Sequence, residues 1–176
     1  MLSPRPTAHG RTAPNVNGAI QSLGEIVEEI KIRKANLEDG TQVAGLLEEL
    51  GFSIKPAFIR LKIEILYKSD RDTVLVSELD NKVLGVAHLH ITEMLHEPGH
   101  IGRIMTIVVK NEHKRSGIGR ALMTSLEIVA QEAGCTRLEI SNDIPREGAR
   151  EFYRSLGYTE ESKRFVKKLV QEQPPP

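Results

Sequence analysis

The sequence predicts an α/β fold in which a mixed, mostly antiparallel sheet is flanked by helices. Two β-rich runs, Thr73–Leu79 and Lys82–Glu93, are separated by the turn-forming pair Asp80 and Asn81, which is typical of an antiparallel hairpin. Residues 101–142 then read as strand, helix and strand, the pattern of a unit with two parallel strands. The predicted order of elements is therefore β-α-α-β-β-β-α-β-α-β.

Composition narrows the class of protein. The 176 residues are enough for one domain with a sizeable core, and 24 acidic residues balance 24 basic ones. A protein that binds nucleic acid or membrane surfaces through charge usually has a basic excess, so we expect neither as a partner. The sequence has no apolar run of transmembrane length and no apolar segment of a secretory signal. We therefore expect a cytoplasmic protein.

One folded unit is expected between two tails. Residues 1–22 are rich in proline, glycine and polar residues, which predicts a flexible N-terminal tail. Residues 23–170 carry the periodic apolar signal of a single domain. Residues 171–176 end in three prolines, which continue neither a helix nor a strand, and are expected to be a disordered tail.

A strand and two helices are predicted ahead of the hairpin. The strand covers Glu29–Ala35, and Asn36 is expected to cap the first helix. The apolar face of this helix consists of Val43, Leu46, Leu47 and Leu50. The second helix begins at Pro56, and its predicted buried stripe consists of Phe58, Leu61, Ile65 and Leu66. In the hairpin, His88 and His90 are predicted on one face with Leu84 and Val86.

The segment from Ile104 to Gly134 joins an apolar strand to a long amphipathic helix through a basic turn. The turn reads Lys114, Arg115, Ser116, Gly117, Ile118, Gly119 and Arg120. Its two glycines let a ligand approach the backbone closely. The free N–H groups and positive dipole end of a helix N-terminus attract anions, and the basic side chains add positive charge. The turn therefore predicts a site for a phosphate or pyrophosphate group.

Two other phosphate-binding motifs do not fit this turn. The dinucleotide-binding fingerprint needs a third glycine where this chain has Leu122, and it follows its strand more tightly than Gly117 follows Val109. A Walker P-loop needs a Gly-Lys-Ser/Thr ending, which is missing here.

The pattern Lys114-x-x-Gly117-x-Gly119 between strand and helix resembles the acetyl-CoA motif of the GNAT N-acetyltransferase superfamily, where Arg or Gln usually comes first. Residues 149–158, AREFYRSLGY, are similar to the closing signature of that family. The resemblance covers about residues 30–169. It implies acetyl-CoA as cosubstrate, no metal, and a cleft where two parallel strands splay apart. Predicted final elements are a strand at Arg137–Asn142, a helix near Arg146–Leu156 and a strand at Arg164–Leu169.

The resemblance also implies which residues bind acetyl-CoA. The backbone of Ile107, Val108 and Val109 would pair with the pantetheine arm, and an N–H near them would polarise the thioester carbonyl. The turn from Lys114 to Arg120 would hold the pyrophosphate. Asn142 is expected either to touch the pantetheine or to cap a loop. In the family the second helix borders the acceptor pocket, so Ile59 and Ile63 are expected either to form an apolar acceptor wall or to pack against a strand.

For catalysis, the family gives the protonation of the departing thiolate to the tyrosine that corresponds to Tyr153. A phenol is protonated at neutral pH, although the position of Tyr153 on the apolar stripe of its helix equally predicts a core residue. The glutamate that many relatives use as base is Met105 here. Candidate bases are His88, His90 and Glu93; alternatively, the amine arrives neutral through a chain of water molecules.

The predicted function is transfer of an acetyl group from acetyl-CoA to a primary amine, directly within a ternary complex. The chain has one cysteine, Cys135, and it lies in neither motif, which argues against a covalent intermediate. The expected acceptor is a small-molecule amine. Alternatives are a protein acceptor, through lysine or the N-terminal amine, and a non-catalytic acetyl-CoA sensor. Relatives often dimerise through sheet edges, so a homodimer is a further hypothesis.

Overall fold

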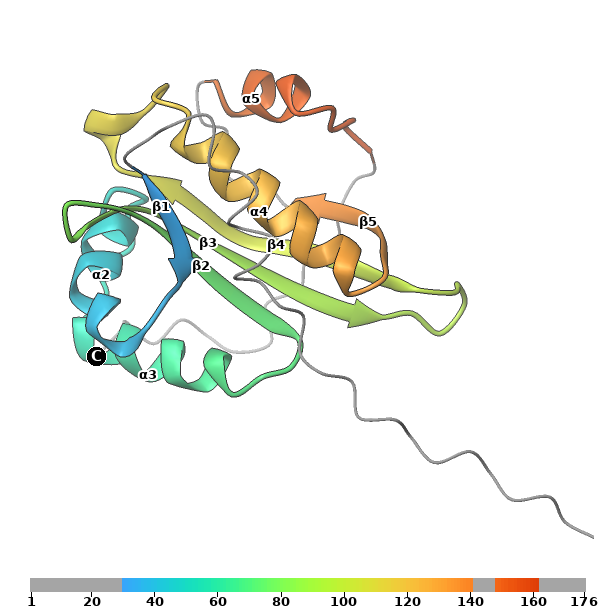
Figure 1. The fold of residues 1–176 in the computed structure, drawn as a ribbon, viewed down its shortest axis with the longest axis horizontal. Coiled ribbons are helices and arrows are strands. Elements are labelled where there is room, and N and C mark those ends of the chain that lie inside the picture. Colours follow the sequence, from blue (N-terminus) through green and yellow to red (C-terminus); the bar gives the residue numbers. More distant parts are fainter. Residues whose placement is uncertain (1–29, 141–147, 162–176) are drawn as a thin grey trace, which may run out of the picture.

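The computed structural model describes residues 30–140 and 148–161. They contain one five-stranded sheet in which neighbouring strands follow chain order, antiparallel except for the parallel pair β4–β5 (Figure 1). The strands are β1 (Lys31–Lys34), β2 (Asp72–Leu79), β3 (Lys82–Glu93), β4 (His100–Val109) and β5 (Cys135–Ile140). This architecture confirms the predicted fold class. The predicted strand Arg164–Leu169 and both predicted tails lie outside the described residues.

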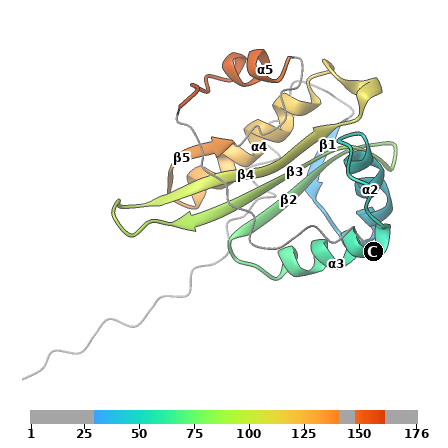
Figure 2. The same ribbon diagram turned by 180° about the vertical axis from the view of Figure 1, so that it is seen from behind.

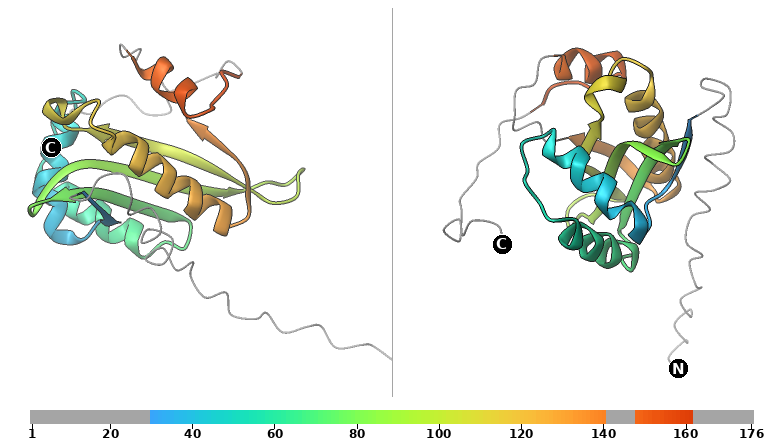
Figure 3. Two further views of the ribbon diagram at one scale, coloured as in Figure 1. Left: turned by 45° about the horizontal axis from the view of Figure 1, so that its top comes forward. Right: turned by 90° about the vertical axis from the view of Figure 1, so that its left-hand side faces the viewer.

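Helices cover both faces of the sheet. Two helices lie on one face, α4 crosses the other, and α5 lies beside α4 (Figures 2 and 3). Their bounds are α2 (Gly40–Glu48), α3 (Pro56–Tyr67), α4 (Ile118–Glu132) and α5 (Ala149–Ser155), with short 3-10 turns η1 (Leu37–Asp39) and η2 (Asn111–His113). Asn36 accepts a hydrogen bond from Glu38 N–H and Asp39 accepts one from Asn36 N–H, so the predicted cap is present at η1. Together these elements give the predicted order as far as α5.

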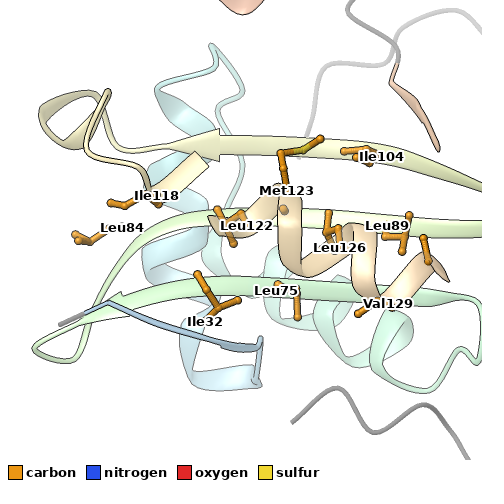
Figure 4. Close-up of a cluster of buried hydrophobic side chains, with 12 residues drawn as sticks. Ile32, Leu75, Leu84, Leu89, Ile104, Ile118, Leu122, Met123, Leu126 and Val129 are labelled. Carbon is orange, nitrogen blue, oxygen red and sulfur yellow. The ribbon is translucent and has the colours of Figure 1, made fainter. Parts of the chain in front are cut away.

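The core has one part on each side of the sheet. On the α4 side, Leu122 and Leu126 are completely buried against Leu75 and Leu89 from the central strands (Figure 4). On the other side, residues of α2 and α3 pack on β2, β3 and Val108 of β4. The face of α4 that the sequence predicted is the one that is buried. Because α4 is fixed along its length, its N-terminal turn has a set position at the end of β4.

The hairpin turn is also as predicted. Asp80 and Asn81 have φ values of 49° and 63°, the left-handed conformation that the favoured two-residue turns require. One detail of β3 differs. Val83 pairs with Glu78 but Gly85 pairs with Ser77, so Leu84 is an extra residue in a bulge. For this reason Leu84 packs on the α4 side, while Val86 lies on the opposite face, which His88 and His90 share by strand alternation.

The predicted buried stripe of α3 is wrong. Ile59 and Ile63 are 6% and 4% exposed and lie in the core with Val76, whereas Phe58, Leu61 and Ile65 are about half exposed. Apolar residues occur all round this helix, so periodicity left its orientation undecided, and packing against β2 and α2 selects the Ile59–Ile63 face. Both residues therefore pack in the core against the sheet, which is one of the two predicted alternatives.

Replacing Ile63 by alanine should lower the free energy of unfolding by about 2–4 kcal/mol, because it leaves a cavity between α3 and the sheet. The matched change Ile65→Ala on the exposed side of the same helix should cost less than about 0.5 kcal/mol. Urea denaturation of both variants measures this difference. Equal losses would show that α3 is rotated relative to the structure described.

Candidate functional site

The site begins where β4 loses one of its two neighbours. Strand β3 pairs with β4 along its whole length, but β5 pairs only with His100 to Ile104. At this point Met105 is an extra residue in the ladder, because His88 pairs with Thr106 while Leu89 pairs with Ile104. A bulge of this kind bends and twists its strand, which separates β4 from β5. From Met105 to Val109 no described strand pairs with this edge, so its backbone groups can bind an extended ligand.

The free edge runs through η2 into the N-terminus of α4. Gly117 precedes this helix with a φ of 87°, a conformation that glycine adopts without strain, and Arg115 also has a positive φ. The N–H of Ala121 bonds to the carbonyl of Gly117, so the N–H groups of Ile118 to Arg120 precede the first intrahelical donor. These groups and the helix dipole give the predicted anion site its main-chain donors.

Three residues of the turn have structural roles. Ile118 is only 1% exposed, so its side chain belongs to the core and only its backbone can meet a ligand. A Cβ on Gly119 would lie 3.2 Å from the ring of Phe152, so this glycine makes room for α5. Arg120 adds a hydrogen bond of 3.3 Å from Nη2 to Ser155 Oγ. The missing side chain at Gly119 thus lets α5 pack closely on the first turn of α4. Asn142 lies outside the described residues.

Tyr153 is part of an aromatic cluster on this docked helix. Its ring centroid lies 5.3 Å from that of Phe152 and 6.2 Å from that of Tyr158. The Tyr158 hydroxyl donates a 3.0 Å hydrogen bond to Glu127 of α4, and burial together with the negative charge of Glu127 raises the pKa of Tyr158. The structure therefore packs Tyr153, partly buried, against the core, on a helix that contacts the first turn of α4, while its role as general acid stays a prediction.

The two histidines of β3 share a buried carboxylate. His88 Nε2 and His90 Nδ1 lie 2.8 Å and 2.9 Å from the same atom, Oδ1 of Asp72, whose side chain is 10% exposed. Oδ2 of Asp72 accepts a 2.6 Å hydrogen bond from Ser69 Oγ. Burial alone would raise the pKa of Asp72, but the hydrogen bonds from Ser69 and the histidines outweigh it and lower the pKa. An ionised Asp72 accepts from both rings and fixes their orientations.

Glu93, the third candidate base, lies elsewhere. It pairs with His100 at the far end of the β3–β4 hairpin, with Oε2 3.0 Å from His100 Nδ1. Four residues of β3 separate it from Leu89, where the bulge begins, which corresponds to about 13 Å. The structure therefore brings His88 and His90 together near the bulge and leaves Glu93 apart. Among residues 30–140 and 148–161 no group of three potential ligands could hold a metal ion, and no helix there could span a membrane.

Comparison with known proteins now gives the family. A sequence model of the Acetyltransferase (GNAT) family matches residues 37–158. The chain is also 30% identical over 156 residues to the aminoalkylphosphonate N-acetyltransferase of Salmonella typhimurium, an alignment that covers 82% of this chain and 95% of the relative. The chain belongs to the GNAT acetyltransferase family. It is thus a GNAT-family N-acetyltransferase, as the two sequence motifs predicted.

Solved structures agree on the fold of this acetyltransferase. Glucosamine-6-phosphate N-acetyltransferase from Arabidopsis thaliana superposes with a TM-score of 0.69 at 21% identity, covering 80% of this chain and 99% of that one. An aminoglycoside N-acetyltransferase in complex with CoA gives a TM-score of 0.70 at 16% identity, covering 80% of this chain and 95% of the other.

Asp72 is a residue of the candidate site that was not predicted from the sequence. A two-residue turn at Asp80 and Asn81 alone would place Asp72 opposite Leu89. The bulge at Leu84 shifts the register by one, so that Asp72 pairs with His90. A glycine next to the extra residue was the available signal, because Gly85 lies in a strand interior.

Because the pKa of Asp72 is lowered by folding, its stabilising contribution is present above the ordinary carboxyl pKa of about 3.9 and disappears as the pH falls through its lowered value. Asp72→Asn should therefore be less stable than the natural protein at pH 7, by about 1–3 kcal/mol, and the difference should shrink in acid. Denaturation at several pH values measures it, with exposed Asp70→Asn as the control. A difference that stays constant with pH would show that Asp72 gains nothing from its partners.

Proposed function

We propose that this acetyltransferase transfers the acetyl group of acetyl-CoA directly to the primary amine of a small molecule within a ternary complex. The observation that carries the proposal is the edge of β4 from Met105 to Val109, with which no described strand pairs. It leads through a short turn to the N-terminal N–H groups of α4. A long ligand with a peptide-like arm and a pyrophosphate matches this arrangement of donors. The relative at 30% identity, which acts on aminoalkylphosphonates, supports a small amine as acceptor.

The residues assigned to acetyl-CoA fall into two groups. The backbone of Ile107 to Val109 pairs with the pantetheine arm, and one of its N–H groups polarises the thioester carbonyl. The N–H groups of residues 117–120 hold the pyrophosphate, while Lys114 and Arg115 contribute mobile charge beside it. Asn142 remains a proposed pantetheine contact.

The amine approaches from the opposite face of the sheet. Helices α4 and α5 occupy one face beside the anion site (Figure 3). On the other face, α2 and α3 pack over β2 and β3, while side chains of β4 and β5 such as Arg103 and Glu139 are half exposed. Thr106, His88 and His90 lie on this second face by strand alternation from Val108 and Val86. An amine there can meet the thioester at the bulge.

His88 is the proposed base. It lies opposite Thr106, next to the extra residue Met105, whereas His90 lies one pleat farther from the unpaired edge. When Nε2–H of His88 donates to Asp72, the lone pair of Nδ1 is left to accept a proton from the ammonium group of the acceptor. The ionised Asp72 then stabilises the imidazolium that forms. This is how a site whose usual glutamate is replaced by Met105 can still deprotonate an amine.

The transfer itself then needs one further proton. The neutral amine attacks the thioester carbonyl, the C–S bond breaks, and the Tyr153 hydroxyl protonates the departing thiolate. The proton that the attacking nitrogen loses as the amide forms then restores the Tyr153 hydroxyl. Direct transfer is supported by the position of Cys135, which pairs with His100 at the end of β5 remote from the bulge. A protein acceptor, a homodimer and a cytoplasmic location stay hypotheses.

Tyr153→Phe keeps the ring contacts with Phe152 and Tyr158 and removes only the hydroxyl. It should lower kcat at saturating acetyl-CoA and amine by about 100-fold or more, the usual contribution of a general acid. Thiol release measures the rate, and Tyr158→Phe is the matched control because its hydroxyl bonds to Glu127. An unchanged kcat would exclude the acid role. A natural protein that binds acetyl-CoA but releases no thiol with any amine would favour the sensor function.

His88→Gln should lower kcat/KM for the amine by about 100-fold or more and remove the acid limb of the pH profile of kcat/KM. His90→Gln should have a smaller effect, because in this proposal the His90 ring binds the same carboxylate as His88 but takes no proton from the amine. His96, which is largely exposed, supplies the control variant His96→Gln. If His88→Gln keeps both the rate and the acid limb, the amine reaches the site neutral without a dedicated base.

A further inference from the structure

A row of charged and polar side chains crosses the acceptor face of the sheet. Asp72 of β2 pairs with His90 of β3, His90 pairs with Arg103 of β4, and Arg103 pairs with Glu139 of β5. All four lie on the face opposite α4, because their neighbours Leu89, Ile104 and Leu138 pack on the α4 side. Asp72 binds His90, and Glu139 binds Arg103 through a 3.1 Å contact to Nη2. The two inner members of the row, His90 and Arg103, therefore lie side by side between two carboxylates.

Glu139 orients the guanidinium of Arg103 but accepts a hydrogen bond from only one of its nitrogens. Glu139 also accepts from Nε of Arg137 at 3.2 Å, and Arg137 has a second carboxylate, Glu97, at 2.7 Å from Nη1. Although burial would raise the pKa of Glu139, its hydrogen bonds to the two arginines lower it, so it stays ionised. Within the described part of the chain, Nε and Nη1 of Arg103 have no acceptor, and its side chain is 47% exposed. Arg103 thus has donors available on the acceptor face.

The place of Arg103 along β4 relates it to the reaction. It lies two residues before the bulge at Met105, about 7 Å along the strand, and one strand away from the His88–Asp72–His90 cluster. An acceptor with its amine at His88 would therefore bring a group a few bonds away to the guanidinium. A planar guanidinium with parallel N–H donors matches the oxygens of a phosphonate, phosphate or carboxylate.

We propose that Arg103 binds an anionic group of the acceptor, so that the preferred substrate is a short zwitterion with a primary amine and a phosphonate or related oxyanion. The inference rests on the proposed function, since it assumes that the amine reacts at His88. Glu139 holds the guanidinium in place, and the amine end is selected separately by the histidine cluster. Arg103 is a specificity residue and takes no part in the transfer of the acetyl group.

The test compares two amines of similar length, aminoethylphosphonate and propylamine, in the full-length protein with saturating acetyl-CoA. Arg103→Gln should lower kcat/KM for aminoethylphosphonate by about 10- to 100-fold, mainly through KM, because a charge-assisted contact is lost. The value for propylamine should stay within about twofold. Arg137→Gln, which changes the other arginine on Glu139, is the control and should leave the ratio of the two amines nearly unchanged, while Arg103→Lys should restore part of the preference.

The outcomes separate this inference from the proposed function. If the natural protein is inactive with both amines, the proposed function is overturned and this inference with it. Activity with both amines but an unaltered ratio in Arg103→Gln would overturn the inference alone. An equal fall for both amines would also overturn it, because Arg103 would then support the fold or the reaction and not the anion. A thermal melt of each variant identifies a change that merely unfolds the protein.

Discussion

One extra residue in β4 determines most of the geometry of the site. Because Met105 has no partner in the β3 ladder, the strand twists there and β5 stops pairing at Ile104. Among the described strands, the remaining half of β4 has only β3 as a neighbour. Without this bulge, β5 could continue along β4 and pair with the main-chain donors and acceptors from Met105 to Val109. The N-terminus of α4 would then follow a strand that is paired on both sides.

A second bulge, at Leu84, determines which side chains meet near that edge. It changes the register of β2 against β3 by one residue and so places Asp72 opposite His90 instead of Leu89. One face of β3 thereby carries imidazole groups oriented by a buried carboxylate, while the other face stays apolar against α4. The chain has Met105 where the family resemblance predicts an acidic base, and the neighbouring strand carries this set of polar groups.

Much of this arrangement could be predicted from sequence because local chemistry decides it. Asp80 and Asn81 accept the left-handed turn, Gly117 accepts the left-handed cap, and the apolar face of α4 is unambiguous. The orientation of α3 could not be predicted, because apolar residues surround the helix and only contact with β2 selects Ile59 and Ile63. The role of Asp72 was missed for a similar reason: a register shift depends on pairing between strands and leaves almost no local signal. Arg103 was one of several charged residues near the strand until its register placed it beside His90.

The contact between Gly119 and Phe152 joins two functions that the sequence presents as separate motifs. The turn that is proposed to grip the nucleotide is also the surface on which α5 rests, and Arg120 is bonded to Ser155 across the same junction. If a nucleotide binds at this turn, the contacts with Phe152 and Ser155 connect its site directly to the helix that carries Tyr153. A nucleotide bound at the turn would therefore also limit local opening of α5, and with it the movement of Tyr153.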